Sequence, residues 1–172
     1  MRALQPSKWF LGALSILWGT TLAITARSIS VLLVDDDPGD VLMIEEALGS
    51  IGAPRTVFVV NDGEEAVAFL RQTGEFVKAP RPDVVLLDLN MPRMDGRQVL
   101  AEIKTDVELR SIPIVVLTTS QSPADIVSSY SLHANAYVTK PMNLDDLTEV
   151  VHKIDYFFAR IAALPSQRPV AS

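Results

Sequence analysis

The chain contains no cysteine among its 172 residues. Disulfide bonds, thiolate catalysis and cysteine-ligated metals are therefore excluded. Positive charge is also scarce, because 15 lysines and arginines face 21 aspartates and glutamates, giving a formal net charge of −6. A nucleic-acid-binding surface normally shows a clustered basic face, so this balance argues against a nucleic-acid partner. The sequence contains neither an internal repeat nor a low-complexity tract, and its length suits one domain with its own core.

The first 28 residues contain no acidic side chain and differ in composition from the rest of the chain. Trp9–Ala26 is an uncharged, largely apolar run preceded by Arg2 and Lys8. Such a run suits a signal-peptide core or a short membrane anchor, although glycine, serine and threonine dilute it. A misassigned start, which would put this stretch outside the working protein, is a third interpretation, and all three stay open. We divide the chain into a hydrophobic N-terminal segment (1–28), a domain (29–165) and a flexible tail (166–172).

Beyond residue 28, short apolar runs alternate with stretches in which apolar residues recur every three or four positions. The apolar runs predict buried strands, because a parallel strand covered on both faces is apolar throughout. The stretches between them predict helices, and Asp37 followed by Pro38 is a favourable helix start. The expected strands are 30–34, 56–60, 83–88, 114–117 and 134–139, and helices are expected to begin near residues 37, 63, 96, 123 and 144. This alternation predicts an α/β domain of three layers, with helices on both faces of a parallel sheet.

Residues suited to phosphoryl chemistry stand at the ends of four of these apolar runs. Asp35 and Asp36 follow the first run, Asp88 ends the third, Thr118 ends the fourth and Lys140 follows the fifth. The carboxyl ends of parallel strands share one edge of an open sheet, where ligands usually bind. Taken singly, each residue has an ordinary alternative as a helix cap, a solvated turn residue or a strand threonine. Their joint occurrence at four strand ends favours a phosphate site.

The chemistry of such a site gives each residue type a role. A strand-end carboxylate can accept a phosphoryl group covalently, as in aspartyl-phosphate intermediates. Because the acceptor and the phosphoryl oxygens are both anionic, positive charge is needed between them. Asp35 and Asp36 offer the hard oxygen ligands that Mg²⁺ prefers, and the carbonyl of Asn90 is a further candidate ligand. Lys140 offers a fixed positive charge and Thr118 a hydroxyl donor to the other phosphoryl oxygens.

Around these positions the sequence resembles the receiver domain of two-component response regulators, across residues 29–160. The motifs that carry the resemblance are VLLVDD (31–36), LDLNMP (87–92) with DG (95–96), VLT (116–118) and YVTKP (137–141). The resemblance implies a flavodoxin-like (βα)5 fold whose parallel sheet has the order 2-1-3-4-5, as in the chemotaxis regulator CheY. It also implies a phosphoprotein of a phosphorelay, phosphorylated by a sensor histidine kinase.

The same resemblance implies a role for each residue of the site. The implied roles are phosphoacceptor for Asp88; Mg²⁺ ligand for Asp35, Asp36, Asp88 and the Asn90 carbonyl; phosphoryl contact for Thr118 and Lys140; and switch aromatic for Tyr137. Phosphorylation is expected to draw Thr118 inward and to vacate space that Tyr137 can fill. The protein is thus expected to be a phosphoacceptor and not an enzyme, apart from its own phosphorylation and dephosphorylation.

A narrower resemblance is to stand-alone receivers that partner bacteriophytochrome-type sensor kinases. It rests on the long loop before the third strand, on LRSIP (109–113) and SYSLHAN (129–135), and on the ending YFF (156–158) with LP (164–165). No room remains for an output domain after Pro165, so signalling to a downstream protein target is expected through the receiver's own surface. We expect a cytoplasmic location, although the N-terminal hydrophobic segment leaves a membrane anchor open.

The expected readout surface is the face formed by the fourth helix, the fifth strand and the fifth helix. The aromatic residues placed there are Tyr130, Tyr137, Phe157 and Phe158, for which packing in the core is an equal alternative. We also expect a homodimer to form through this face.

Two other classes of protein remain as alternatives at this point. A phosphohydrolase of the haloacid-dehalogenase type would need a second aspartate two residues after the first, and Asn90 occupies that position. A receiver-like interaction module that never takes phosphate would be favoured by loss of an acidic-pair residue, of Thr118 or of Lys140, and all of these are present.

Overall fold

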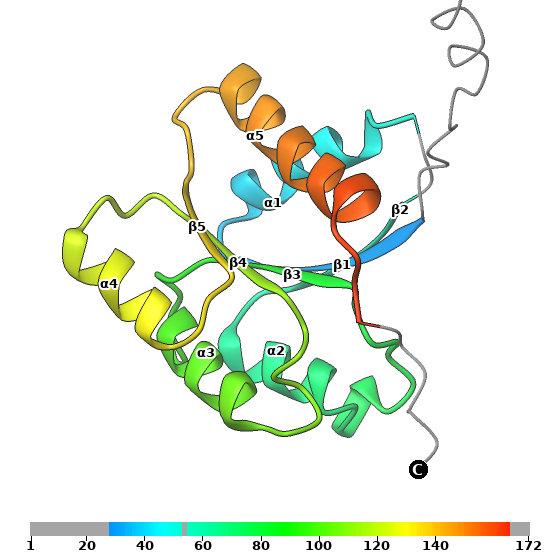
Figure 1. Ribbon diagram of the computed structural model, residues 1–172, viewed down its shortest axis with the longest axis vertical. Coiled ribbons are helices and arrows are strands. Elements are labelled where there is room, and N and C mark those ends of the chain that lie inside the picture. The colour runs from blue at the N-terminus through cyan, green and yellow to red at the C-terminus, as the bar shows by residue number, and fades with distance from the viewer. Residues whose placement is uncertain (1–27, 53–54, 166–172) are drawn as a thin grey trace, which may run out of the picture.

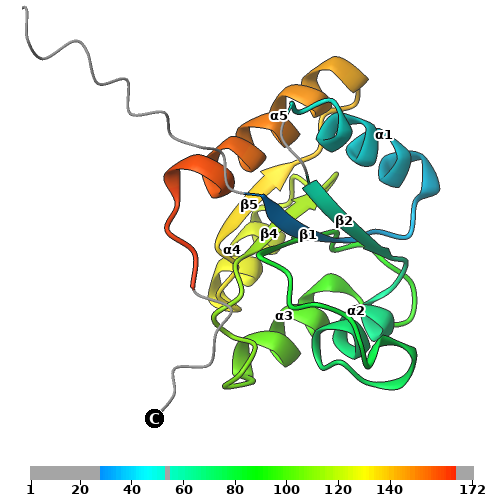
Figure 2. The ribbon, with the colours of Figure 1, turned by 90° about the vertical axis from the view of Figure 1, so that its right-hand side faces the viewer.

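The computed structural model describes residues 28–52 and 55–165, which build a five-stranded parallel sheet flanked by helices (Figures 1 and 2). The strand order is β2-β1-β3-β4-β5, which confirms the predicted flavodoxin-like topology. The strands are β1 (Ile29–Val34), β2 (Arg55–Val60), β3 (Val84–Leu87), β4 (Ile114–Thr118) and β5 (Ala136–Thr139). The helices are α1 (Pro38–Gly49), α2 (Gly63–Leu70), α3 (Gly96–Thr105), α4 (Pro123–Ser131) and α5 (Leu144–Tyr156), with a 3₁₀ turn η1 (Gly74–Phe76) and a π-helical turn η2 (Phe157–Ile161).

Helices α1 and α5 cover one face of the sheet, and α2, α3 and α4 cover the other (Figure 1). Alternate residues of each strand therefore point into two separate apolar cores. Leu33 of β1 packs with Ile44 of α1 and Val151 of α5. Its neighbour Leu32 belongs to the opposite core, together with Ile103 of α3. Because both faces of the sheet are covered, its polar chemistry is concentrated at the strand ends.

Local hydrogen bonds fix the turn that leads from β1 into α1. Oδ1 of Asp37 accepts hydrogen bonds from the backbone N–H groups of Gly39 at 2.7 Å and Asp40 at 3.1 Å. Asp37 therefore caps the helix, and Pro38 occupies its first turn, as predicted. Oδ1 of Asp35 in turn accepts a hydrogen bond from the Asp37 N–H at 3.1 Å. The acidic residues after β1 are thus held in a fixed turn at the carboxyl edge of the sheet.

The connection from β3 to α3 passes close to the backbone of Asp88. The N–H of Gly96 donates to the carbonyl oxygen of Leu89 at 3.0 Å. A capping box between Asp95 and Gln98 then starts α3. A Cβ at position 96 would lie 2.2 Å from the carbonyl oxygen of Asp88, so this approach requires glycine.

The structure differs from the predicted elements mainly at their ends. β5 begins at Ala136 rather than at residue 134, and the predicted long loop before β3 contains the turn η1. The helix predicted to begin near residue 144 ends as an α-helix at Tyr156, and the π-helical turn η2 begins at Phe157. Phe158 is buried in the core under α5, whereas Phe157 is half exposed. The predicted hydrophobic segment 1–28 (apart from Ser28) and the tail 166–172 lie outside the described residues, and within these residues no helix has the length and apolar character needed to cross a membrane.

Candidate metal and phosphoryl site

Three carboxylates meet at the carboxyl edge of the sheet. Asp35 and Asp36 follow β1 and Asp88 follows β3, and each offers an oxygen within 4.8 Å of the other two. Asp35 and Asp88 are buried, whereas Asp36 is exposed and opens the cluster to solvent. Burial raises the pKa of the Asp35 carboxyl above its usual value, although the adjacent Lys140 opposes this rise. Clustered carboxylate oxygens open to solvent on one side fit a hard divalent cation that keeps some of its water.

Asp88 is held in place through its backbone and one side-chain oxygen. Its N–H donates to the carbonyl oxygen of Val34 at 2.9 Å, which ties it to the end of β1. Its Oδ1 accepts a hydrogen bond from the N–H of Leu89 at 2.8 Å. The other oxygen, Oδ2, lies 3.9 Å from the ammonium of Lys140. Oδ2 is therefore the oxygen of Asp88 available for reaction or for a cation.

Lys140, directly after β5, brings a buried positive charge into the cluster. Its backbone N–H donates to the carbonyl oxygen of Thr118 at 2.7 Å. Its Nζ donates to Oδ2 of Asp35 at 2.6 Å and to Oδ2 of Asp40 at 2.7 Å. Burial lowers the pKa of the Lys140 amine, but the two carboxylates outweigh burial and leave that pKa above its ordinary value. The ammonium is therefore charged and is bound more closely by Asp35 and Asp40 than by Asp88.

Asp40 is a member of this cluster that the sequence did not reveal. It lies in the first turn of α1, and an aspartate there is commonly explained by the helix dipole alone. One feature of the sequence did point toward the cluster. Asp40 follows Asp36 by four residues, which is about one helical turn, at the start of the helix that leaves the carboxyl edge of the sheet. That spacing alone did not predict its contact with Lys140.

The side chains of Thr118 and Asn90 contact each other. Thr118 ends β4 and is fully buried, whereas Asn90 is exposed on the loop after β3. Nδ2 of Asn90 donates to Oγ1 of Thr118 at 3.4 Å, and the N–H of Ser120 donates to the same oxygen at 3.4 Å. Both contacts are long and hence weak. The hydroxyl of Thr118 can therefore be redirected at little cost.

Tyr137 is connected to the loop after Thr118. Its hydroxyl donates to the carbonyl oxygen of Ser120 at 2.9 Å, and its half-buried ring packs against the core under α3. Oγ of Ser120 donates to Asp125 of α4 at 2.6 Å, and Asp125 also forms an ion pair with Arg97 of α3. The hydrogen bonds from Ser120 and Arg97 lower the pKa of the Asp125 carboxyl. This network, which the sequence did not predict, links the β4–α4 loop to two helices.

A family model, the response regulator receiver domain, matches residues 31–152. The chain therefore belongs to the response regulator receiver domain family, as its motifs predicted. It is a receiver-domain response regulator, and so a signalling protein of the two-component type. Phosphorylation of an aspartate and binding of a divalent metal are typical of this family.

Cyanobacterial response regulators are among the relatives of this chain. Response regulator Rcp1 of Synechocystis sp. is 45% identical over 136 residues, which cover 79% of this chain and 92% of Rcp1. The crystal structure of the phosphorylated cyanobacterial phytochrome response regulator RcpA is 49% identical, has a TM-score of 0.79, and is matched over 81% of this chain and 100% of RcpA. The crystal structure of the Mn²⁺-bound form of Rcp1 is 44% identical, has a TM-score of 0.76, and is matched over 80% of this chain and 99% of Rcp1.

Proposed function

We propose that this response regulator accepts a phosphoryl group on Asp88 from a sensor histidine kinase, with Mg²⁺ as its cation. The observation that carries the proposal is the convergence of three carboxylates and a buried ammonium at one edge of the sheet. Asp35 is the less suitable acceptor, because it is bound to Lys140 at 2.6 Å. Oδ2 of Asp88 lies 3.9 Å from that ammonium. At this distance the positive charge of Lys140 can stabilise the negative charge of a phosphoryl group on Asp88.

In the proposed transfer, Oδ2 of Asp88 forms a bond to phosphorus. The phosphorus–nitrogen bond of the donor phosphohistidine breaks, and its electron pair returns to the imidazole ring. Asp35, Asp36, Asp88 and the Asn90 carbonyl would hold Mg²⁺, which supplies positive charge to the phosphoryl oxygens. Lys140 provides a second positive charge and Thr118 a hydroxyl donor, so that these oxygens meet fixed partners. Autophosphorylation from small acyl phosphates and self-dephosphorylation belong to the same proposal.

The response to phosphorylation is proposed to be a two-state switch. Thr118 loses its long contacts and turns toward the phosphoryl group. Tyr137 then breaks its hydrogen bond to Ser120, and its ring moves into the space that Thr118 has left. A phosphoryl group can shift this equilibrium only by its differential interaction with the two states. A change from mostly inactive to mostly active requires on the order of 5 kcal/mol.

The partners proposed are a kinase of the phytochrome type, a downstream protein target and a second copy of the chain. The likeness to RcpA supports the proposed kinase type, and a cytoplasmic location belongs to the same proposal. The working unit proposed is the domain 29–165.

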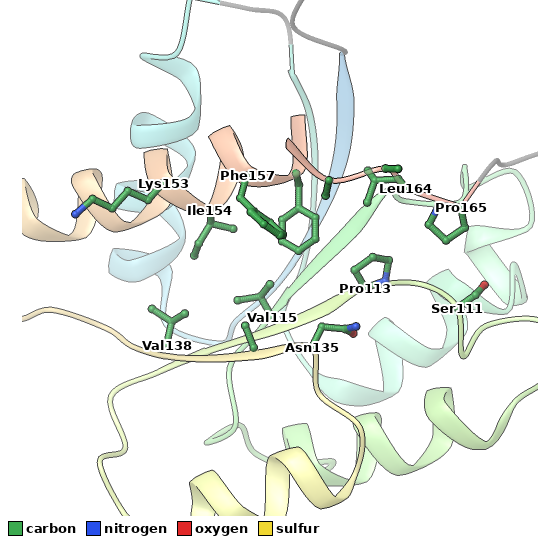
Figure 3. A pocket seen from close by; sticks show the side chains of 14 residues that line it. Ser111, Pro113, Val115, Asn135, Val138, Lys153, Ile154, Phe157, Leu164 and Pro165 are labelled. Atoms are coloured by element: carbon green, nitrogen blue, oxygen red, sulfur yellow. The ribbon is translucent and has the colours of Figure 1, made fainter. Parts of the chain in front are cut away.

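The proposed surface for readout and dimerisation is the face formed by α4, β5 and α5. Tyr130 of α4 and Phe157 after α5 are both about half exposed on it, at 51% and 48%. Between β4, β5 and the end of α5 lies a hollow of about 690 Å³, lined by apolar side chains that include Val138 and Phe157 (Figure 3). Exposed aromatic rings beside an apolar hollow are typical of interaction surfaces. Phe158 also lines the hollow, but its side chain is buried and packs in the core.

Phosphotransfer from a radiolabelled sensor histidine kinase of the phytochrome type tests the proposal. The wild-type chain should take up the label in the presence of Mg²⁺, and Asp88→Asn should not. Asp37→Asn is the matched control, because Asp37 belongs to the same acidic run but serves as a helix cap, a role that asparagine fills equally well. Label on Asp88→Asn would contradict the assignment of the phosphoacceptor.

A further inference from the structure

Within the described part of the chain, the ammonium of Lys140 donates hydrogen bonds to two carboxylates, and that of Asp88 is not one of them. Nζ lies 2.6 Å from Asp35 and 2.7 Å from Asp40, but 3.9 Å from Asp88. An ammonium has three donors, and two of them are committed to these carboxylates. The third donor is free for a phosphoryl oxygen on Asp88, and a close contact there draws the ammonium toward Asp88 and away from the two carboxylates.

The two contacts differ in how easily they can be given up. The side chain of Asp35 is 1% exposed, so losing its cation would leave a buried charge without a partner, which is costly. The side chain of Asp40 is 24% exposed, so water can solvate it when the ammonium departs. Its backbone is fixed independently, because its N–H is capped by Asp37. Asp40 can therefore release Lys140 without disturbing α1.

We propose that Asp40 is a positioning residue that retains Lys140 away from the phosphoryl position and competes with the phosphoryl group for it. The inference rests on the proposed function. It means that a residue in the first turn of α1 affects how readily Asp88 is phosphorylated. Lys140 then has two positions: one bound to Asp40 when Asp88 is free, and one nearer Asp88 when a phosphoryl group is present. Removing the charge of Asp40 frees the ammonium for the second position.

Titration of the full-length protein with beryllofluoride, a tetrahedral phosphoryl analogue that binds carboxylates, tests the proposal at saturating Mg²⁺. Asp40→Asn should tighten beryllofluoride binding about three- to fivefold, the range expected for a partly exposed ion pair. Glu45→Gln is the matched control, because it removes the same charge from an exposed position of the same helix. The control should leave the affinity within about 1.5-fold, since exposed charges are screened.

A double-mutant cycle separates competition for Lys140 from simple repulsion between Asp40 and the analogue. In a Lys140→Met background, Asp40→Asn should change the affinity no more than Glu45→Gln does. A loss of helix stability alone would lower the unfolding temperature without tightening analogue binding. Unchanged or weaker binding by Asp40→Asn, or tightening that persists in the Lys140→Met background, would overturn the inference while leaving Asp88 as the acceptor. Absence of beryllofluoride binding by the wild-type chain would overturn both proposals together.

Discussion

At the scale of single residues, Asp88 is positioned by contacts on two sides of its backbone. Its N–H is bonded to Val34 of the neighbouring strand, and its carbonyl oxygen lies under Gly96 at the start of α3. The side chain is therefore aimed before any ligand arrives, and only Oδ2 is left for chemistry. Pre-aligned groups of this kind save the cost of reorganisation during the reaction.

Gly96→Ala should disturb this alignment. The added Cβ would lie 2.2 Å from the Asp88 carbonyl oxygen, a backbone atom that can move only with its strand. The free energy of unfolding should fall by about 2 kcal/mol or more, as for other overpacked sites, and phosphorylation of Asp88 should slow. Urea denaturation measures the first effect, and the rate of phosphorylation by acetyl phosphate measures the second.

Gly49→Ala is the control for this substitution. A Cβ at Gly49, the last residue of α1, would meet open space. Alanine there should leave the rate unchanged and raise stability by up to about 1 kcal/mol. Equal stability of the two variants would show that the contact over Asp88 is not tight.

The residues of the site were predictable from sequence where they end strands. Asp35, Asp88, Thr118 and Lys140 all follow apolar runs, and parallel topology alone brings such ends together. Asp40 was missed because its role depends on which way the Lys140 side chain turns, which no sequence pattern specifies. The Arg97–Asp125 pair was missed for the same reason, since it depends on how α3 and α4 pack against each other.

At the scale of secondary-structure elements, α5 is joined to the edge strand β2 by a buried ion pair. Arg55 begins β2 and Asp155 lies near the end of α5, with side chains only 3% and 4% exposed. Nη2 of Arg55 donates to Oδ2 of Asp155 at 2.7 Å. The pair thus ties α5 to the edge of the sheet that it covers.

Asp155→Ala should lower the free energy of unfolding by about 3 to 5 kcal/mol, because it leaves the arginine buried without this partner. Glu149→Ala is the control, since Glu149 pairs with Lys153 on the exposed side of the same helix. That loss should cost no more than about 0.5 kcal/mol. Chemical denaturation measures the free energy of unfolding of both variants. A similar loss of stability in the two would contradict a structural role for the buried pair.

The elements themselves followed from apolar periodicity, but their ends and outer faces did not. In α4, Val127 and Tyr130 were part of the apolar pattern that predicted the helix, yet both side chains are more than half exposed. The single buried residue among the nine that form α4 is Ser129. Apolar residues that serve an outer surface cannot be distinguished by spacing from those that serve a core. Likewise, the π-helical turn after Tyr156 leaves no signature in the stripe of α5.

At the scale of the whole molecule, the exposed apolar residues of α4 and the end of α5 predict dimerisation on activation. The full-length chain bound to beryllofluoride should elute as a dimer in size-exclusion chromatography with light scattering. Val127→Ser on α4 should weaken this dimer, because it removes apolar surface from the proposed interface. Leu42→Ser is the control, since Leu42 is equally exposed, at 65%, but belongs to α1. A monomer with and without the analogue would contradict the predicted dimer.

The central claim is that Asp88 is a metal-dependent phosphoacceptor, and intact-mass spectrometry of the full-length chain tests it most directly. The wild-type protein and Asp88→Asn are incubated with acetyl phosphate, with Mg²⁺ and with a chelator. We predict a single phosphoryl adduct on the wild-type chain, formed only with Mg²⁺ and absent from Asp88→Asn. An adduct on Asp88→Asn, or none on folded wild-type protein under any condition, would contradict the claim; the second result would favour a phosphate-independent interaction module.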